Sequence, residues 1–248
     1  MKQVLVISNQ KGGVGKTTSA VSIAAALARL DKRVVLVDLD PQCNLTRGLG
    51  LGEAAHNVYG ALLGEYRLKA YAAGPQNLAV VAGSPALSGF EHTKGSEPNR
   101  EFLLRELIAP LAERCDFIVI DCPPALGLIT LNAYACAHEV LIPLEAQQYA
   151  LDGLEKVLEF VTRVQQRFNP TLKIGGIFFT KHDKRKVLRR QMAELVHSQH
   201  PELLLDTVIR ESIALGEAPS AGLDIFSYAP ASAGASDYQA LVTELLGR

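Results

Sequence analysis

The sequence has no tryptophan, only four cysteines and no long apolar run. The cysteines form no CxxC pair and no set with metal-ligand spacing, which argues against zinc and fits buried thiols in a reducing compartment. No stretch approaches the roughly 18 apolar residues of a membrane-spanning helix. The first residues enter an apolar run almost at once, so we expect no signal peptide. These absences predict a soluble, cytoplasmic protein.

The chain also lacks a strong charge of either sign. Its 248 residues carry a formal net charge of -1 and are 48% hydrophobic. This balance excludes a globally basic nucleic-acid-binding protein but leaves room for a local basic patch. No repeat, composition shift or long linker divides the chain, so we predict a single domain over residues 1–248 with a sizeable core.

Apolar runs of strand length alternate with segments of helical periodicity. The near-continuous Val, Ile and Leu of "VLVI", "VVLV" and "FIVI" is typical of strands buried on both faces. We therefore predict an α/β fold with a mostly parallel twisted sheet flanked by helices on both faces. Residues 52–96 have poor periodicity and are expected to hold a loop and short helices. The predicted strands are 3–8, 33–38, 78–82, 117–121, 140–143, 174–180 and 207–209. The clearest predicted helices are 16–30, 100–114, 151–168 and 186–197.

Directly after the first predicted strand, residues 9–18 read "NQKGGVGKTT". A glycine-rich turn between a strand and a helix lets backbone N–H groups converge on phosphate oxygens, and the positive end of the helix adds to the attraction. In such a loop Lys16 reaches the β- and γ-phosphates, and the Thr17 hydroxyl holds Mg²⁺. Gln10 occupies the first glycine position of the general motif. The predicted nucleotide-binding residues are Lys11, Gly12, Gly13, Val14, Gly15, Lys16, Thr17 and Thr18.

Three carboxylates end two of the predicted strands. Asp38 and Asp40 lie in "VVLVDLDPQ", and Asp121 follows "FIVI". Because ligands collect beyond the carboxyl ends of parallel strands, we expect all three to point toward the phosphate loop. Asp121 fits the acidic residue that holds Mg²⁺ directly or through a water.

The only concentrated basic stretch is "TKHDKRKVLRRQ", with six basic residues against Asp183. A solvated helix face is the usual meaning of such a run. Because the rest of the chain is slightly acidic, the concentration favours a contact with a phosphate backbone that does not read sequence. "TKHD" also matches a guanine-reading motif of signal-recognition GTPases. We interpret this match as chance, although guanine specificity stays open.

"KGGVGKTT" resembles the deviant phosphate loop of the ParA/MinD group of ATPases and departs from the general motif in that group's way. "DLDPQ" resembles the group's first switch, and "EAPS" at 217–220 resembles part of its C-terminal signature. The likeness is strongest to ParA-type (Soj-like) partition ATPases. It implies that Lys11 crosses an ATP-sandwich dimer to the partner's phosphates, that Asp40 positions or activates the attacking water, and that Asp38 supports Mg²⁺ or the loop. The catalytic residues would be Lys11, Lys16 and Asp40, and the metal residues Thr17, Asp38 and Asp121.

The resemblance further implies a protein that binds ATP and Mg²⁺, forms a homodimer on ATP and coats the nucleoid through non-specific DNA. A ParB-like centromere-binding protein would stimulate its slow hydrolysis. A basic position of the family corresponds to Ala214 here. The DNA-binding residues would be Lys184, Arg185, Lys186, Arg189, Arg190 and Arg210.

The two ends of the chain argue against two branches of the ParA/MinD group. Only ten residues precede Lys11, so we expect no N-terminal helix-turn-helix domain. The chain stops at Arg248 without a basic-hydrophobic tail, which disfavours the membrane-cycling branch of the group.

Two alternatives share the same motifs. One is an ATPase that positions a protein cluster on the nucleoid. The other is a metabolic P-loop enzyme, either a ligase like dethiobiotin synthetase or a reductase like the nitrogenase iron protein. The reductase needs cysteines that carry an iron–sulfur cluster between subunits, and Cys122 and Cys136 are the candidates.

Overall fold

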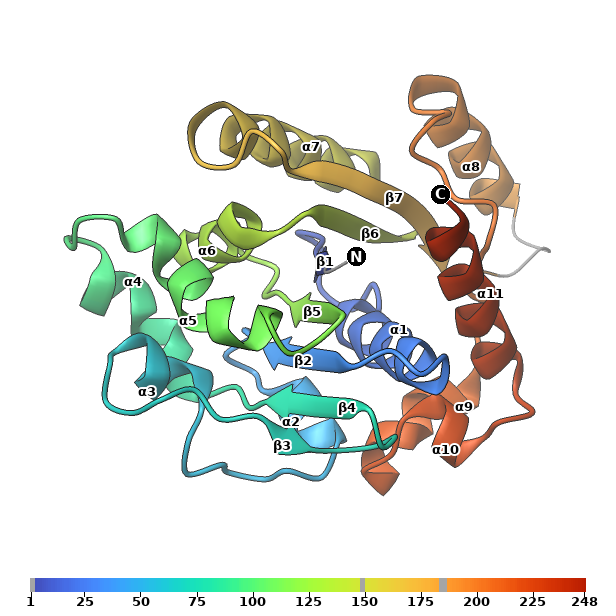
Figure 1. Cartoon of the computed structure of the whole chain (residues 1–248). Coiled ribbons are helices and arrows are strands. Elements are labelled where there is room, and N and C mark those ends of the chain that lie inside the picture. Colours follow the sequence, from blue (N-terminus) through green and yellow to red (C-terminus); the bar gives the residue numbers. More distant parts are fainter. Residues whose placement is uncertain (1–2, 148–149, 183–186) are drawn as a thin grey trace.

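The protein is described here by a computed structural model that covers residues 3–147, 150–182 and 187–248. Within these residues the centre is a seven-stranded sheet in the order β3-β4-β2-β5-β1-β6-β7 (Figure 1). Neighbouring strands are parallel except β3 and β4, which are antiparallel. The mostly parallel sheet is thus confirmed. The strands are β1 Gln3–Ile7, β2 Val34–Asp38, β3 Tyr71–Ala72, β4 Leu78–Val81, β5 Phe117–Asp121, β6 Glu139–Glu145 and β7 Lys173–Thr180.

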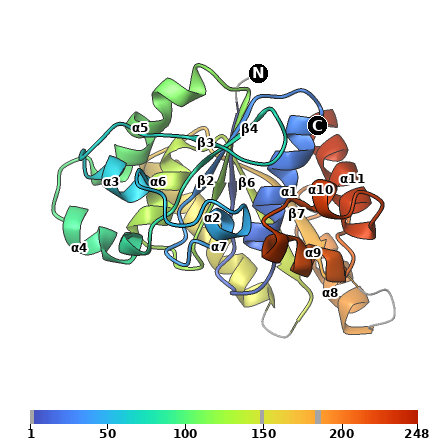
Figure 2. The ribbon, with the colours of Figure 1, turned by 90° about the horizontal axis from the view of Figure 1, so that it is seen from below.

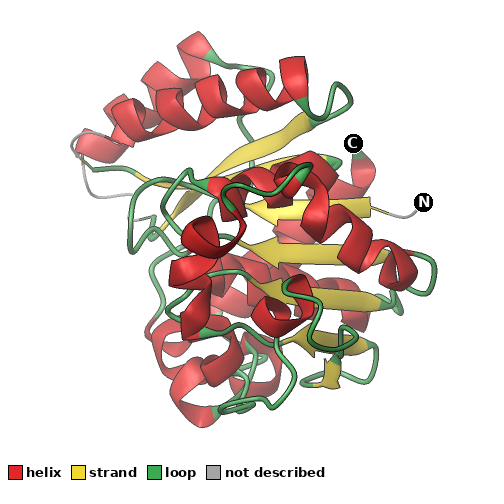
Figure 3. Cartoon of the chain, turned by 90° about the vertical axis from the view of Figure 1, so that its left-hand side faces the viewer, coloured by secondary structure: helices red, strands yellow, loops and turns green. Residues whose placement is uncertain are grey.

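Helices cover both faces of the sheet, as predicted. Figure 2 shows the sheet between one layer that contains α5, α6 and α7 and a second that contains α1 and α11, and Figure 3 shows helices in front of the strands and behind them. In the described part of the chain, no helix is long and apolar enough to cross a membrane. The helices are α1 Lys16–Arg29, α2 Asn44–Gly48, α3 Val58–Leu62, α4 Phe90–Lys94, α5 Leu103–Ala112, α6 Leu128–Cys136, α7 Ala150–Arg167, α8 Val187–Gln199, α9 Ile213–Glu217, α10 Ile225–Tyr228 and α11 Ala233–Gly247.

Each face of the sheet has its own apolar core. Along β1 the side chains alternate, so that Val4 and Val6 pack on the side of α5 to α7 while Leu5 and Ile7 pack on the side of α1 and α11. A strand with both faces covered must be apolar at every position, which explains the unbroken "VLVI". Fully burying one such side chain contributes about 1.5–3 kcal/mol.

Helix α1 sets the position of the phosphate loop relative to the sheet. Its sequence is rich in alanine, which has the highest helix propensity, and Ala24, Ala25 and Ala26 are fully buried. Small side chains let the helix axis approach the sheet closely. The helix ends at Arg29, just before Asp31 adopts a left-handed backbone with φ of 58°.

Two predicted elements differ in the structure. The predicted strand at 207–209 is not a strand, although its chain runs beside β7 and the amides of Leu205 and Ile209 donate to the carbonyls of Ile177 and Phe179. The donors are four residues apart and the acceptors only two, so extra residues bulge out and no regular ladder forms. The predicted helix at 100–114 begins as a 3₁₀ turn over Arg100–Phe102.

Candidate nucleotide-binding site

The site lies at the carboxyl end of β1, where the chain order of the sheet reverses. β1 sits between β5 and β6, and the connections that follow it lead first to the β2 side and later to the opposite side. Such a switch point leaves a crevice for ligands. In register, Ile7 pairs with Asp121 and Asp121 with Asp38, so the loop after β1 and both carboxylates meet at one edge. The predicted juxtaposition is confirmed.

Glycines give the loop after β1 its shape. Gly13 and Gly15 have φ of 77° and 88°, a left-handed conformation that strains other residues. A Cβ added at Gly12 or Gly13 would meet nothing within 4 Å, so the backbone there is open to a ligand. Gly15 offers no side-chain cap to α1, so the N–H groups of the first turn are available to an anion.

Two side chains outside the predicted set brace this loop. The Asn9 amide nitrogen donates to the Pro143 carbonyl at 2.8 Å, and the Asn9 amide oxygen accepts from the Lys11 backbone at 3.0 Å. On the far side, the Thr180 hydroxyl donates to the Val14 carbonyl at 2.8 Å. Asn9 lies within "NQKGGVGKTT". Thr180 is the first residue of "TKHD", so the start of "TKHD" belongs to the site, although its Asp183 lies outside the described residues.

Lys16 is buried among carboxylates. Its side chain is folded against the loop, where Nζ donates to the Lys11 carbonyl at 3.0 Å, and the residue is only 7% exposed. Burial lowers the pKa of Lys16, while Asp121 and Asp40 act in the opposite direction. The ammonium therefore lies where phosphate oxygens would replace a weak neutral acceptor.

Asp121 is fully buried and has no hydrogen-bond partner of normal geometry on either oxygen among the described residues. Burial, then the charge of Asp38, raises its pKa, and an interaction with the Thr17 hydroxyl offsets this only in part. A buried carboxylate without donors is costly, because its desolvation is not compensated. Its orphaned oxygens beside a threonine hydroxyl fit a Mg²⁺ ion, which prefers one or two carboxylates together with substrate phosphates.

Asp38 has the opposite environment although it is equally buried. One carboxylate oxygen accepts from the Thr46 amide at 2.9 Å and from the Thr46 hydroxyl at 2.6 Å, and the other accepts from the Asp40 amide at 3.2 Å. Burial raises its pKa to about 6, while the Thr46 bonds lower it. These bonds hold the segment that carries Asp40, whose own carboxylate accepts from the Gln42 amide at 2.9 Å.

A cleft of about 380 Å³ opens over the loop and is lined by most of the predicted nucleotide-binding residues. Two further clefts begin at Thr18. One runs to Tyr238 along Thr180 and residues 209–212, and the other runs to Ala218 and Pro219 of the "EAPS" segment. The main cleft is lined by Gly12, Gly13, Gly15, Lys16, Thr17, Thr18, Asp40, Gln42, Asn44, Pro124 and Lys181.

Lys11 stands apart from Lys16. Its Nζ donates to the Gln147 side-chain oxygen at 2.7 Å, a contact exposed to solvent. The two lysines of the motif therefore have different environments within the same loop.

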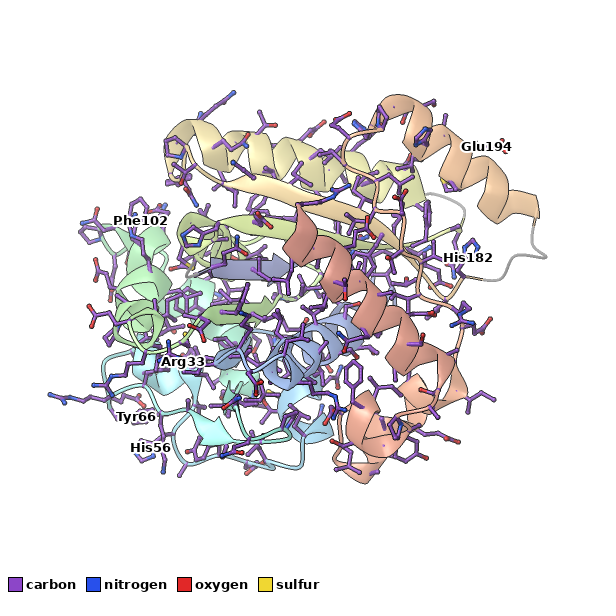
Figure 4. All side chains as sticks on the ribbon, turned by 45° about the vertical axis from the view of Figure 1, so that its right-hand side comes forward. Arg33, His56, Tyr66, Phe102, His182 and Glu194 are labelled. Carbon is purple, nitrogen blue, oxygen red and sulfur yellow. The ribbon has the colours of Figure 1, made fainter. Side chains whose placement is uncertain are left out.

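The predicted DNA-binding residues are only partly described. Lys184, Arg185 and Lys186 lie outside the described residues, which resume after His182 with α8; Figure 4 labels His182 and, on α8, Glu194. Arg189 and Arg190 belong to α8 by their position in the chain, and their side chains are outside the described set. Arg210 is 49% exposed and forms an ion pair with Asp237, at 2.7 Å between Nη2 and Oδ1. The pair satisfies much of the guanidinium, so its position at the cleft wall is fixed.

A strand, a glycine loop with a buried lysine and a buried carboxylate on the neighbouring strand, beside a threonine hydroxyl, define a P-loop nucleoside triphosphatase. A family model described as an AAA domain matches residues 2–174. The chromosome-partitioning ATPase Soj of Treponema pallidum is 42% identical over 100% of this chain and 98% of its own, and the chromosome partitioning protein ParA of Myxococcus xanthus is 41% identical over 99% and 88%. The chain belongs to this Soj/ParA family of partition ATPases, as its motifs predicted.

Solved structures agree with this fold. A Mycobacterium smegmatis protein described as cobyrinic acid a,c-diamide synthase, with bound ADP and magnesium, superimposes with a TM-score of 0.86 at 33% identity, covering 100% of this chain and 97% of that one. The same protein was also solved with an ATP analogue and magnesium. The two curated relatives are more identical in sequence and cover the chain equally well.

Proposed function

We propose that this protein is a Mg²⁺-dependent ATPase of DNA partition. The observation that carries the proposal is the buried Asp121, which ends β5 near Lys16 and Thr17 and has no hydrogen-bond partner of normal geometry among the described residues. Partition relatives of similar length and a neighbour that holds ADP and magnesium support it.

The residues divide the chemistry among them. The loop amides and Lys16 bind the phosphates, and Thr17 and Asp121 would hold Mg²⁺, which draws negative charge away from the phosphate oxygens. Asp40 lies in the cleft wall and positions the water whose oxygen attacks the γ-phosphorus as the bond to ADP breaks. Asp38 supports the segment that carries Asp40 through its bonds to Thr46 and to the Asp40 amide, a role that these hydrogen bonds favour over direct contact with the metal.

The cycle extends beyond one subunit. On ATP the protein forms a homodimer in which Lys11 contacts the partner's phosphates, stabilising charge that spreads over the transferring group. The dimer binds non-specific DNA through the basic segment that ends in α8, and so associates with the nucleoid in the cytoplasm. A ParB-like centromere-binding protein stimulates hydrolysis and releases it. One domain over residues 1–248 performs the whole cycle.

The test is binding to random-sequence duplex DNA with no nucleotide, ADP, ATP and a non-hydrolysable ATP analogue. We expect binding only with ATP or its analogue, and loss of binding when Arg185, Arg189 and Arg190 are changed to alanine. The matched control changes three exposed arginines elsewhere to alanine and should still bind, namely Arg67, Arg114 and Arg167. Binding that ignores the nucleotide, or no binding, would move the function toward protein-cluster positioning or small-molecule chemistry.

The two lysines of the loop separate binding from dimerisation. Lys16→Ala should abolish ATP binding because it removes the buried cation from the phosphate loop. Lys11→Ala should spare binding and lose the ATP dimer, as measured by calorimetry and sedimentation. A Lys11→Ala protein that still dimerises on ATP contradicts the cross-subunit role.

A second candidate is an amide-forming ligase, favoured by the description of the M. smegmatis neighbour as a diamide synthase. Such an enzyme consumes ATP only when a carboxylic acid and a nitrogen donor are present. ATP turnover that depends on cobyrinic acid rather than on DNA would select it. The reductase alternative gains no support from Cys122, which is fully buried, whereas the other candidate, Cys136, is half-buried.

A further inference from the structure

Four side chains form a series of hydrogen bonds that begins at Lys11 of the phosphate loop and ends at Lys181, a residue that lines the cleft. Lys11 Nζ donates to Gln147 Oε1 at 2.7 Å, and Gln147 Nε2 donates to Glu145 Oε1. The other oxygen of Glu145 pairs with Lys181 Nζ at 3.1 Å. These hydrogen bonds join the loop after β1 to the residue after β7 through the end of β6. They thereby connect the ammonium groups of Lys11 and Lys181.

Glu145 decides which end of the Gln147 amide faces Lys11. The Glu145 side chain is 9% exposed and paired with a lysine, so its carboxylate only accepts hydrogen bonds. The amide NH₂ of Gln147 must therefore face Glu145, which leaves the amide oxygen for the ammonium of Lys11. Lys181 has a left-handed backbone with φ of 50°. This conformation is uncommon outside glycine and persists only where surrounding contacts hold the residue in place.

The backbone of Lys11 is held by hydrogen bonds that do not involve Gln147, Glu145 or Lys181. Its amide donates to Asn9 and its carbonyl accepts from Lys16, so the side chain alone is free to change partner. The ammonium has one described acceptor in its own subunit. It must give up that acceptor before it can reach a phosphate in another subunit.

We propose that Gln147, oriented by Glu145, is a positioning residue that holds Lys11 within its own subunit and thereby opposes dimerisation. The inference rests on the proposed cross-subunit role of Lys11. ATP contributes the competing acceptor, because a phosphate oxygen binds an ammonium more strongly than a neutral amide oxygen does. The dimer forms when the exchange favours phosphate.

The experiment compares the wild type with Gln147→Leu, which keeps the size of the side chain but removes both donor and acceptor. The dissociation constant of the dimer is measured by sedimentation with a non-hydrolysable ATP analogue. We expect Gln147→Leu to lower it about three- to tenfold, the effect of one charge-assisted hydrogen bond at an exposed site. Affinity for the analogue, measured in monomer at low protein concentration, should stay within about twofold. The matched control is Gln76→Leu, at an exposed turn before β4 and so at the opposite edge of the sheet.

A gain in dimerisation distinguishes this role from a structural one, because damage to the fold would weaken the dimer. Glu145→Gln should produce a smaller gain, since its amide lets Gln147 turn its oxygen away from Lys11. If Gln147→Leu does not fold, Gln147→Ala replaces it. An unchanged or weaker dimer in a variant that binds the analogue normally overturns the inference alone. A wild type that never dimerises on the analogue overturns the proposed function and the inference with it.

Discussion

Asp38 and Asp121 end neighbouring strands, stand opposite each other in register and are both fully buried. Asp38 accepts three hydrogen bonds, whereas neither oxygen of Asp121 has a partner of normal geometry in the described residues. Two identical side chains at equivalent positions thus have opposite energetic roles. A buried carboxylate with its hydrogen bonds satisfied stabilises the fold. A buried carboxylate without donors is tolerated where a ligand supplies the missing contacts.

Changing Asp121 tests the unsatisfied side of this comparison and should have the largest effect. We expect Asp121→Asn to reduce kcat for ATP hydrolysis at least about 100-fold, since it removes the carboxylate assigned to the metal. The same change should raise the free energy of unfolding by about 1 kcal/mol, because a buried charge without donors disappears. Phosphate release and urea denaturation measure the two effects. Asp116→Asn, at the amino end of the same strand, is the control and should leave hydrolysis unchanged.

Asp38→Ala tests the satisfied side. It leaves the Thr46 amide and hydroxyl and the Asp40 amide without their acceptor in a buried site. We expect the free energy of unfolding to fall by about 2–3 kcal/mol. A variant as stable as the wild type by urea denaturation would show that these bonds do not hold the segment.

The pH dependence of stability sharpens the comparison. Because the pKa of Asp38 is raised to about 6, the folded state binds a proton that the unfolded state has already released, and stability falls as pH rises through this window. Relative to Asp38→Asn, which carries no titrating group there, the wild type should lose about 2 kcal/mol between pH 4.5 and 7. Denaturation curves at both pH values measure this difference. A relative gain in wild-type stability would have the wrong sign.

The smallest expected effect concerns Thr46, whose hydroxyl donates to Asp38 and accepts from the Gly83 amide at 2.8 Å. Thr46→Val should lower the free energy of unfolding by about 1–2 kcal/mol, as measured by urea denaturation. Thr46→Ser retains the hydroxyl and should restore most of the loss. A Thr46→Ser variant as unstable as Thr46→Val would place the effect in packing instead.

Much of the fold followed from local patterns. The strands that flank the site were predicted because full burial requires unbroken apolar runs, and Asp121 was placed correctly because the carboxyl ends of parallel strands share an edge. The short β3 escaped prediction because Tyr71–Ala72 has too few residues for a period and pairs only at the edge of the sheet. The strand predicted at 207–209 was wrong because only Ile209 of these residues bonds to β7, and the other bonding amide, that of Leu205, is too far along the chain for a regular ladder.

The site was predicted in its motifs but not in its supports. No spacing rule connects Lys11 with a glutamine just after β6, and Thr46 and Glu145 also contact Gly83 and Lys181, which are distant from them in sequence. The sequence assigned different roles to Asp38 and Asp121 but could not show which carboxylate has its hydrogen bonds satisfied, because that depends on which donors the fold brings to each.

The side-chain amide of Asn9 adds one hydrogen bond beyond the end of the backbone pairing between β1 and β6. Backbone pairing of β1 with β6 ends where the Ser8 amide meets the Leu141 carbonyl, and the next contact is the Asn9 side chain on Pro143. The Pro143 carbonyl can accept this hydrogen bond, and proline has no backbone N–H that would need a partner of its own. The phosphate loop is therefore attached to β6 by one side-chain hydrogen bond, about 1 kcal/mol. A substitution at Asn9 would remove this bond, together with the acceptor of the Lys11 amide, without changing any glycine or lysine of the loop.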